Sequence, residues 1–218
     1  RPFLSTEIIN KKSQMETFII NNDSIEINEE NKPVKNFEYD YIFDNHSTQQ
    51  DVYEEVTLLI QSMIQGNNIC IIAYGQTCTG KTYTITGPDH KNPGVATRAA
   101  KEIFDILGSN DCKKLFVNSR LTLTIIEIYN EQIFNLLEEG TPSLNMYENA
   151  QGNLEIPELN PISINNFDES CKLFKLASKF RHTSCTEYND RSSRSHCIFS
   201  FKLKLTDKDG KIIRSTLH

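Results

Sequence analysis

The eight residues from Gly75 to Thr82, Gly-Gln-Thr-Cys-Thr-Gly-Lys-Thr, constrain the fold of this chain more than any other stretch. They match the pattern G-x-x-x-x-G-K-[ST], in which glycines let backbone N–H groups approach phosphate oxygens. Such a loop has to follow a strand and open a helix. The segment Ile69–Tyr74 directly before it is short and entirely apolar, as expected of a strand buried on both faces. The pattern therefore predicts an α/β fold that binds a nucleotide.

The side chains of this loop have chemical roles that follow from their types. Lys81 would place its ammonium against the β- and γ-phosphates, and the Thr82 hydroxyl would be a ligand of Mg²⁺. A helix starting near Gly80 would add the positive end of its dipole. The remaining positions would surround the phosphates with backbone N–H groups: Gly75, Gln76, Thr77, Cys78, Thr79 and Gly80. The alternative is a chance glycine-rich turn.

A second polar segment, residues 189–196, interleaves hydroxyl and cationic side chains: Asn-Asp-Arg-Ser-Ser-Arg-Ser-His. Hydroxyls can bond a γ-phosphate and a water on Mg²⁺, and arginines can pair with the anion or with an acidic loop. On composition alone, a solvated Ser/Arg loop or a phosphorylation site explains the segment equally well.

Apolar residues at helical spacing predict four further helices. A capping box at Ser47-x-x-Gln50 would open the first, and Gly66 would end it. The other three are expected from Pro93 or Gly94 to Leu107, over Asn130–Leu137, and along the stripe Phe167, Cys171, Phe174, Ala177 and Phe180.

Other stretches are typical of strands. Leu121–Tyr129 is expected to be buried, and the alternation over 199–205 predicts a half-buried strand followed by a turn at Asp207–Gly210 and a partner strand from Lys211. The Asn/Glu-rich stretch Asn21–Asn36 is interpreted as strand edges and loops. Strands interleaved with helices indicate an α/β layered fold.

Composition excludes several classes. The 218 residues are 38% hydrophobic, enough for one large domain or two small ones. With 29 acidic and 23 basic residues the net charge is −6, which argues against a nucleic-acid partner. The longest apolar run, Ile69–Tyr74, is about a third of a membrane span, so no membrane segment is expected. Six scattered cysteines without a C-x-x-C pair favour reduced thiols in a cytosolic protein rather than structural zinc.

The motifs and their order resemble the kinesin motor domain over essentially the whole chain. Residues 75–82 resemble its P-loop, and N-x-x-S-S-R-S-H at 189–196 resembles its switch I. Further resemblances lie at Phe37–Asp44 with Gln50-Asp51-Val52-Tyr53, at Pro93-Gly94 with Arg98-Ala99, at Glu127–Glu131 with Leu136-Leu137, and at Arg1-Pro2. The resemblance implies a three-layer P-loop NTPase fold with a central, mostly parallel or mixed β-sheet flanked by helices, and an ATP-dependent microtubule motor using ATP and Mg²⁺.

The resemblance also implies site residues. Pro2 would pack on the adenine, and Tyr83 would stack on its face, unless that ring simply packs on the sheet. Asn189, Ser192 and Ser193 would contact the γ-phosphate and the Mg²⁺ shell, with Ser193 joining Thr82 as a metal ligand. Arg194 would pair with a glutamate of switch II. The resemblance thus implies a catalytic set of Lys81, Asn189, Ser192, Ser193 and Arg194.

Partners follow from the same resemblance. The stretch Met146–Leu154 resembles the region that touches tubulin in kinesins, although by itself it is typical of an ordinary hairpin loop. Microtubules are therefore the expected partner, and the cytoplasmic cytoskeleton or spindle the expected location. A coiled-coil dimer partner would contact flanking regions that this chain does not contain.

The chain departs from the family pattern in one respect. Kinesins carry switch II, D-x-x-G-x-E, after a strand that here begins near Arg214, and no such motif occurs in residues 1–218. These residues are thus expected to be the first two-thirds of a motor domain, without switch II and the main track-binding region. The full domain is expected to be a microtubule-stimulated ATPase, and this part alone is expected to be inactive.

Two alternatives stay open. A different P-loop enzyme, such as a GTPase or a small-molecule kinase, would share residues 75–82, but an N-K-x-D loop for guanine is absent, because Asn31-Lys32 is followed by Pro33-Val34. A motor-like module could also hold nucleotide or microtubules without turnover.

Overall fold

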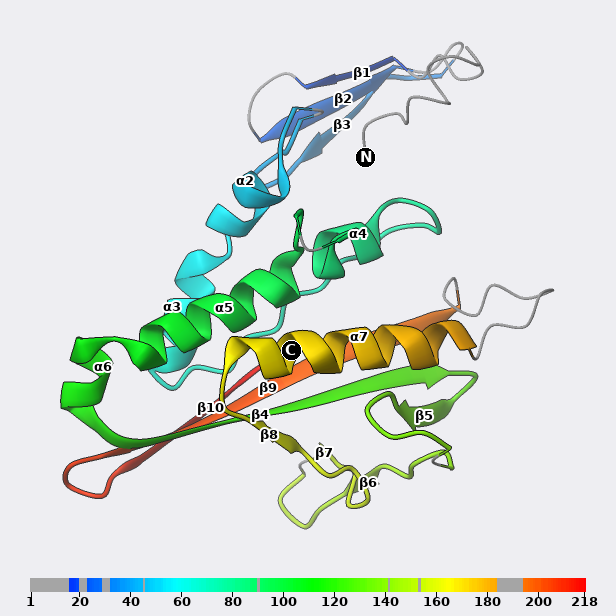
Figure 1. The fold of residues 1–218 in the computed structure, drawn as a ribbon. Helices are drawn as coiled ribbons and strands as arrows, with labels where there is room; N and C mark the ends of the chain where they lie inside the picture. Colours follow the sequence, from blue (N-terminus) through cyan, green and yellow to red (C-terminus); the bar gives the residue numbers. More distant parts are fainter. Residues whose placement is uncertain are drawn as a thin grey trace. The chain divides into compact units, whose positions relative to one another are not determined.

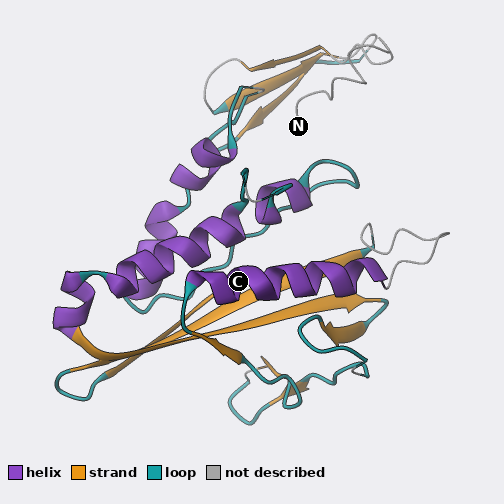
Figure 2. Ribbon diagram, in the orientation of Figure 1, coloured by secondary structure: helices purple, strands orange, loops and turns teal. Residues whose placement is uncertain are grey.

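The computed structural model describes residues 16–19, 23–28, 32–44, 46–89, 91–140, 142–152, 154–183 and 194–218 (Figures 1 and 2). The chain divides into two compact units, Arg1–Glu55 and Val56–His218. Each unit has its own β-sheet.

The first unit is a small antiparallel sheet followed by a helix, α2 (Gln49–Glu54). Part of the sheet comes from the stretch 21–36, which agrees with its interpretation as strand edges and loops. The strands pair in the order β1-β2-β3, with bounds β1 (Glu16–Ile19), β2 (Ser24–Asn28) and β3 (Lys35–Glu38).

The capping box of α2 lies one residue later than predicted. Thr48 Oγ1 accepts from the Asp51 N–H at 3.3 Å, and Asp51 Oδ2 accepts from the Thr48 N–H at 2.6 Å. Ser47 instead donates its hydroxyl to Asp44 Oδ1 at 3.0 Å. These backbone and hydroxyl donors lower the pKa of both aspartates below the usual value.

The single helix predicted up to Gly66 is also wrong. The structure has α2 and a second helix, α3 (Thr57–Ile64), which begins in the second unit. Two β-branched residues, Val56 and Thr57, stand at the break, and such side chains lower helix propensity.

The second unit contains a five-stranded sheet in the order β10-β9-β4-β5, with β8 also paired to β4. All pairs between these strands are antiparallel, whereas Ile69 forms a parallel bridge with Leu217. The predicted mixed α/β fold is therefore confirmed. The bounds are β4 (Phe116–Tyr129), β5 (Gln132–Asn135), β8 (Ile162–Ile164), β9 (Ser195–Asp207) and β10 (Ile212–Leu217).

Helices pack on one face of this sheet. Helix α7 (Phe167–Thr183) lies along β4 and β8 and contacts α5 (Val95–Gly108), as Figure 1 shows. Its Phe174 ring packs edge-on against Phe199 and Phe201 of β9, with centroid distances of 5.5 and 6.2 Å. The other described helices of the unit, besides α3, are α4 (Lys81–Thr86) and α6 (Asn110–Leu115).

Two predicted helices are confirmed nearly to the residue. Helix α5 starts after Gly94 and ends at Gly108, and the stripe from Phe167 to Phe180 lies on α7. The alternation in β9 is confirmed from Phe201 to Leu205, because Phe201, Leu203 and Leu205 are buried, whereas it fails before them, since Ser200 is buried and Phe199 is half-buried. The intervening Lys202 and Lys204 are exposed.

The helix predicted over Asn130–Leu137 is wrong. Asn130 and Glu131 have φ of 49° and 61° and form a two-residue turn between β4 and β5, with Tyr129 opposite Gln132. Two consecutive positive φ values define the turn that best matches the twist of a hairpin. The sequence hides this turn because its second residue is a glutamate rather than a glycine.

The segment 69–74 is not the doubly buried strand that was predicted. Its backbone pairs with the end of β10, through Ile69 N–H to Thr216 O at 2.8 Å and Ile71 N–H to His218 O at 2.8 Å. Beyond this pairing, Ile72 and Tyr74 are 76% and 98% exposed. The segment therefore lies at the edge of the described sheet, paired on one side.

Three smaller expectations can be compared with the structure. The stretch 146–154 lies in a hairpin of β6 (Tyr147–Glu148) and β7 (Leu154–Glu155), as expected. The five cysteines among the described residues are free. No helix in the described part of the chain is long and apolar enough to cross a bilayer.

Candidate functional site

The loop 75–82 has the structural context that its pattern requires. It follows the segment held against β10 and it leads into α4, which begins at Lys81 with Gly80 as its N-cap. Gly80 has φ of 94°, a conformation that side-chain-bearing residues rarely adopt. The loop therefore joins a sheet edge to a helix through a turn that needs glycine at this position.

The loop is closed by its own hydrogen bonds. Thr79 Oγ1 donates to the Gln76 carbonyl oxygen at 2.8 Å, and the Thr79 N–H points to the same oxygen at 3.4 Å. A Cβ on Gly75 would lie 2.7 Å from Thr79 Oγ1, too close for a real contact. Glycine at position 75 thus allows Thr79 to close the loop.

Lys81 brings a positive charge onto this loop. Its Nζ donates to the carbonyl oxygens of Gly75 at 2.9 Å and Gln76 at 2.5 Å. The ammonium is therefore held at the first residues of the loop rather than extended into solvent. A held ammonium beside a glycine-lined backbone turn fits a polyphosphate, which needs both counter-charge and close N–H groups.

The next two side chains of α4 remain accessible. Thr82 is exposed, and Tyr83 is 52% exposed. No group of three His, Cys, Asp or Glu side chains that could hold a metal ion occurs in the described residues.

The far end of α4 is fixed to α5 by a tightly folded connection. Gly87 has φ of 78°, and a Cβ there would overlap the Asn92 carbonyl oxygen and the backbone nitrogen of Gly94. The Gly94 N–H donates to Thr86 O at 3.1 Å, and Arg98 Nε donates to Pro93 O at 2.9 Å. Helix α5 therefore supports the loop through α4.

The predicted switch residues are only partly described. Arg194 is exposed and directly precedes β9, whereas Asn189, Ser192 and Ser193 lie outside the described residues. Pro2 lies outside them as well.

A buried polar cluster, which sequence reasoning missed, lies where α7 ends and β9 begins. We call it the Glu127 cluster, consisting of Glu127, Arg181 and Ser195. Glu127 is fully buried, and its Oε1 accepts from Ser195 Oγ at 2.6 Å and from Arg181 Nε at 3.2 Å. Arg181 Nη2 also donates to Ser195 Oγ at 3.1 Å. Nearby, burial raises the pKa of Cys197 to about 11, and the Arg181 cation partly opposes that rise.

A signal for this cluster was present in the sequence. Glu127 is a lone carboxylate inside the apolar run of β4, and charged residues are rarely fully buried unless they are paired. The family resemblance covers Glu127, but it did not assign a role to that residue.

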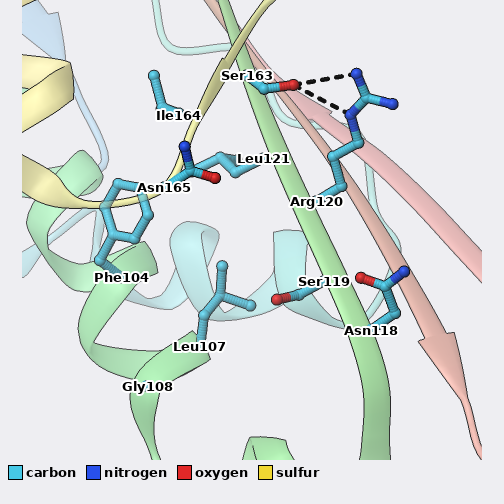
Figure 3. Close-up of a pocket in the computed structure, with 10 residues that line it drawn as sticks. All are labelled: Phe104, Leu107, Gly108, Asn118, Ser119, Arg120, Leu121, Ser163, Ile164 and Asn165. Carbon is cyan, nitrogen blue, oxygen red and sulfur yellow. Dashed lines mark hydrogen bonds between the residues drawn. The ribbon is translucent and has the colours of Figure 1, made fainter.

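A separate cavity of about 500 Å³ lies between the end of α5 and the strands β4 and β8 (Figure 3). Phe104 and Leu107 line one side, and Arg120 donates to Ser163 Oγ on another, at 3.2 and 3.1 Å. Among the described residues, none of those predicted to form the nucleotide site lines it.

Comparisons with known proteins identify relatives of the whole chain. The family model of the kinesin motor domain matches residues 1–218. "Kinesin-like protein KIN-14A" of Oryza sativa subsp. japonica is 34% identical over 225 residues, covering 100% of this chain and 22% of that protein. "Kinesin-like protein KIN-14L" of Arabidopsis thaliana is 35% identical over 187 residues, covering 84% and 19%. The chain thus spans about a fifth of these relatives.

A solved structure is similar over the whole chain. It is described as the structure of a fast kinesin, with implications for its ATPase mechanism and its interactions with microtubules. The TM-score is 0.90 at 26% identity, and the match covers 100% of this chain and 61% of the other.

The glycine connection after α4 provides a stability test. We expect Gly87→Ala to lower the free energy of unfolding by more than about 2 kcal/mol, because the new Cβ meets backbone atoms and φ is unfavourable. Gly108→Ala is the matched control, because nothing lies within 4 Å of its Cβ and it ends a helix. That variant should gain up to about 1 kcal/mol. Urea unfolding of both variants measures the difference, and equal stabilities would contradict the tight packing at Gly87.

Proposed function

The chain belongs to the kinesin motor domain family, and on that basis we propose that it forms the nucleotide-binding part of an ATP-dependent microtubule motor. One observation carries this proposal: the ammonium of Lys81 is held on the loop 75–82 by two carbonyl oxygens. The hydrolysis and movement that the proposal includes belong to the complete protein, since the chain spans 61% of the similar solved kinesin.

The loop would bind the phosphates of ATP. Backbone N–H groups between Gly75 and Gly80 would approach the phosphate oxygens, and Lys81 would supply the counter-charge. Tyr83, whose side chain is half exposed, would stack on the adenine, together with Pro2. The position of Tyr83 as the third residue of α4 supports this role, because the residue lies next to the loop.

Thr82 and Ser193 would supply hydroxyl ligands to Mg²⁺. The ion, when bound, neutralises charge on the phosphate oxygens. The exposure of Thr82 in the first turn of α4 supports its part in such a site.

The γ-phosphate would be sensed by the switch residues Asn189, Ser192, Ser193 and Arg194. Hydroxyl and amide groups suit hydrogen bonds to the phosphate and to a metal-bound water, whereas an arginine suits an acidic partner. The position of Arg194 at the start of β9 supports this proposal, because β9 belongs to the same sheet as β10, which pairs with the residues before the loop.

The hairpin of β6 and β7 would contribute to tubulin binding. Three apolar side chains on it are more than half exposed, namely Met146, Tyr147 and Leu154. Exposed apolar groups on a short hairpin are common at protein interfaces. The protein would then act on microtubules in the cytoplasm.

A second candidate is a motor-like module that binds nucleotide without hydrolysing it. This candidate and the motor share nucleotide binding at residues 75–82 and differ only in whether the complete protein hydrolyses ATP. Measurement of turnover in the complete protein separates the two candidates.

Removal of the Lys81 ammonium tests nucleotide binding. We expect Lys81→Ala to reduce the affinity for Mg·ATP by about 100-fold or more, because the β- and γ-phosphate oxygens lose their main counter-charge. Lys101→Ala is the control, since that lysine is exposed and pairs with Asp105 on α5. Calorimetric titration should show unchanged affinity in the control. Equal ATP affinity in Lys81→Ala and the parent would contradict the phosphate-binding role.

The switch residues should act on turnover rather than on affinity. In the complete protein, Ser193→Ala or Arg194→Ala should lower the microtubule-stimulated kcat by about 100-fold while changing the ATP dissociation constant by less than about threefold. The reason is that these groups would stabilise the transferring phosphoryl group in the transition state. Steady-state ATPase assays together with equilibrium nucleotide binding measure both quantities, and an unchanged kcat would identify the segment as a solvated Ser/Arg loop.

A further inference from the structure

The Glu127 cluster joins two elements that are far apart in the sequence. Arg181 lies near the C-terminal end of α7, whereas Ser195 is the first residue of β9. Both donate to Oε1 of the same buried carboxylate, in the middle sheet strand β4. The three side chains also close a ring, since Arg181 donates to the Ser195 hydroxyl.

We infer that Glu127 is a positioning residue that holds the end of α7 and the start of β9 at a constant separation, and thereby orients Arg194. The inference rests on the proposed function, since it concerns how the residues proposed to sense the γ-phosphate are held. Residues 184–193 lie between the two elements that Glu127 joins.

The strand register supports this role. Tyr129 is opposite Ser195 and Glu127 is opposite Cys197, so Glu127 and Ser195 are diagonal neighbours on one face of the sheet. Helix α7 packs on that same face through Phe174, which contacts Phe199 and Phe201. The carboxylate therefore reaches both a strand residue and the helix end from this face.

The buried charge of Glu127 explains why its carboxylate binds both Arg181 and Ser195. A fully buried carboxylate needs donors, and a charge-assisted hydrogen bond from an arginine is among the stronger ones. The 2.6 Å bond from Ser195 is short, as expected for a hydroxyl that donates to a carboxylate. Because Ser195 directly follows Arg194, any shift of Ser195 also moves the backbone that carries the Arg194 guanidinium.

Removing the charge of Glu127 should lower turnover without weakening nucleotide binding. In the complete protein, we expect Glu127→Gln to reduce the microtubule-stimulated kcat by about tenfold, the scale seen when a residue that orients a functional group is lost. The KM for ATP and the affinity for Mg·ATP should change less than about twofold, because the P-loop is untouched. Glu139→Gln removes an exposed carboxylate that directly precedes Gly140 and is the matched control.

A second measurement does not depend on hydrolysis. Hydrogen exchange of the backbone amides at Ser195–Cys197 and in the last turn of α7 should become faster in Glu127→Gln, whereas exchange at Leu203–Leu205 should not change. If Glu127→Gln does not fold, Ser195→Ala is measured in the same two ways, because it removes one donor and keeps the buried ion pair. A combined Glu127→Gln and Arg181→Gln variant should lose no more turnover than the worse single variant.

The outcomes separate the proposed function, an ATP-hydrolysing motor, from the positioning role of Glu127. If the parent protein does not hydrolyse ATP but exchange changes locally as described, the proposed function is wrong and the positioning role stands. Unchanged exchange at Ser195–Cys197, an unchanged kcat in a parent that does hydrolyse, or a parallel loss of ATP affinity and kcat would each overturn the positioning role.

Discussion

The antiparallel pairing of β4 with β9 is the interaction on which the rest of the second unit depends. It runs from Phe116 opposite Asp207 to Tyr129 opposite Ser195, with a register shift near Asn118. Its inner face carries the buried side chains on which α7 packs, and β10 is hydrogen-bonded to the other edge of β9. The segment that leads into the P-loop pairs in turn with β10. Both the P-loop and the start of β9 are therefore held by one continuous sheet.

The sheet carries two polar sites with opposite charges, the P-loop and the Glu127 cluster. At the P-loop, the Lys81 ammonium is bound to the first carbonyl oxygens of the loop. At the end of α7, a buried negative charge accepts from a cation and a hydroxyl. The positive charge at the P-loop suits an anionic ligand. The carboxylate of the Glu127 cluster already accepts hydrogen bonds from Arg181 and Ser195. The difference explains why we assign binding to the loop and positioning to the Glu127 cluster.

The parts of the fold that the sequence predicts well are those where one residue type decides the local geometry. Gly94 caps the start of α5 and Gly108 is its last residue, and the alternation from Phe201 to Leu205 matches the burial of those apolar side chains in β9. The sequence-based prediction failed where the local sequence is compatible with more than one backbone conformation or more than one degree of burial. Asn130-Glu131 was assigned to a helix, because a positive φ at a glutamate has no signature in the sequence. Ile69–Tyr74 was predicted to be buried from its apolar content, whereas burial depends on which strands lie beside it. The Glu127 cluster depends on contacts between residues 54 and 68 positions apart, which no local pattern contains.

The central claim is that residues 75–82 recognise the phosphates of a nucleotide, and its most direct test compares ligands that differ only in phosphate number. Calorimetric titration of the complete protein with ATP, ADP and AMP, each with Mg²⁺, measures how much affinity the β- and γ-phosphates contribute. We expect ATP and ADP to bind at least about 100-fold more tightly than AMP, because Lys81 and the backbone N–H groups would face the phosphates beyond the first. AMP binding as tightly as ATP, or no binding of any of the three, would contradict the account.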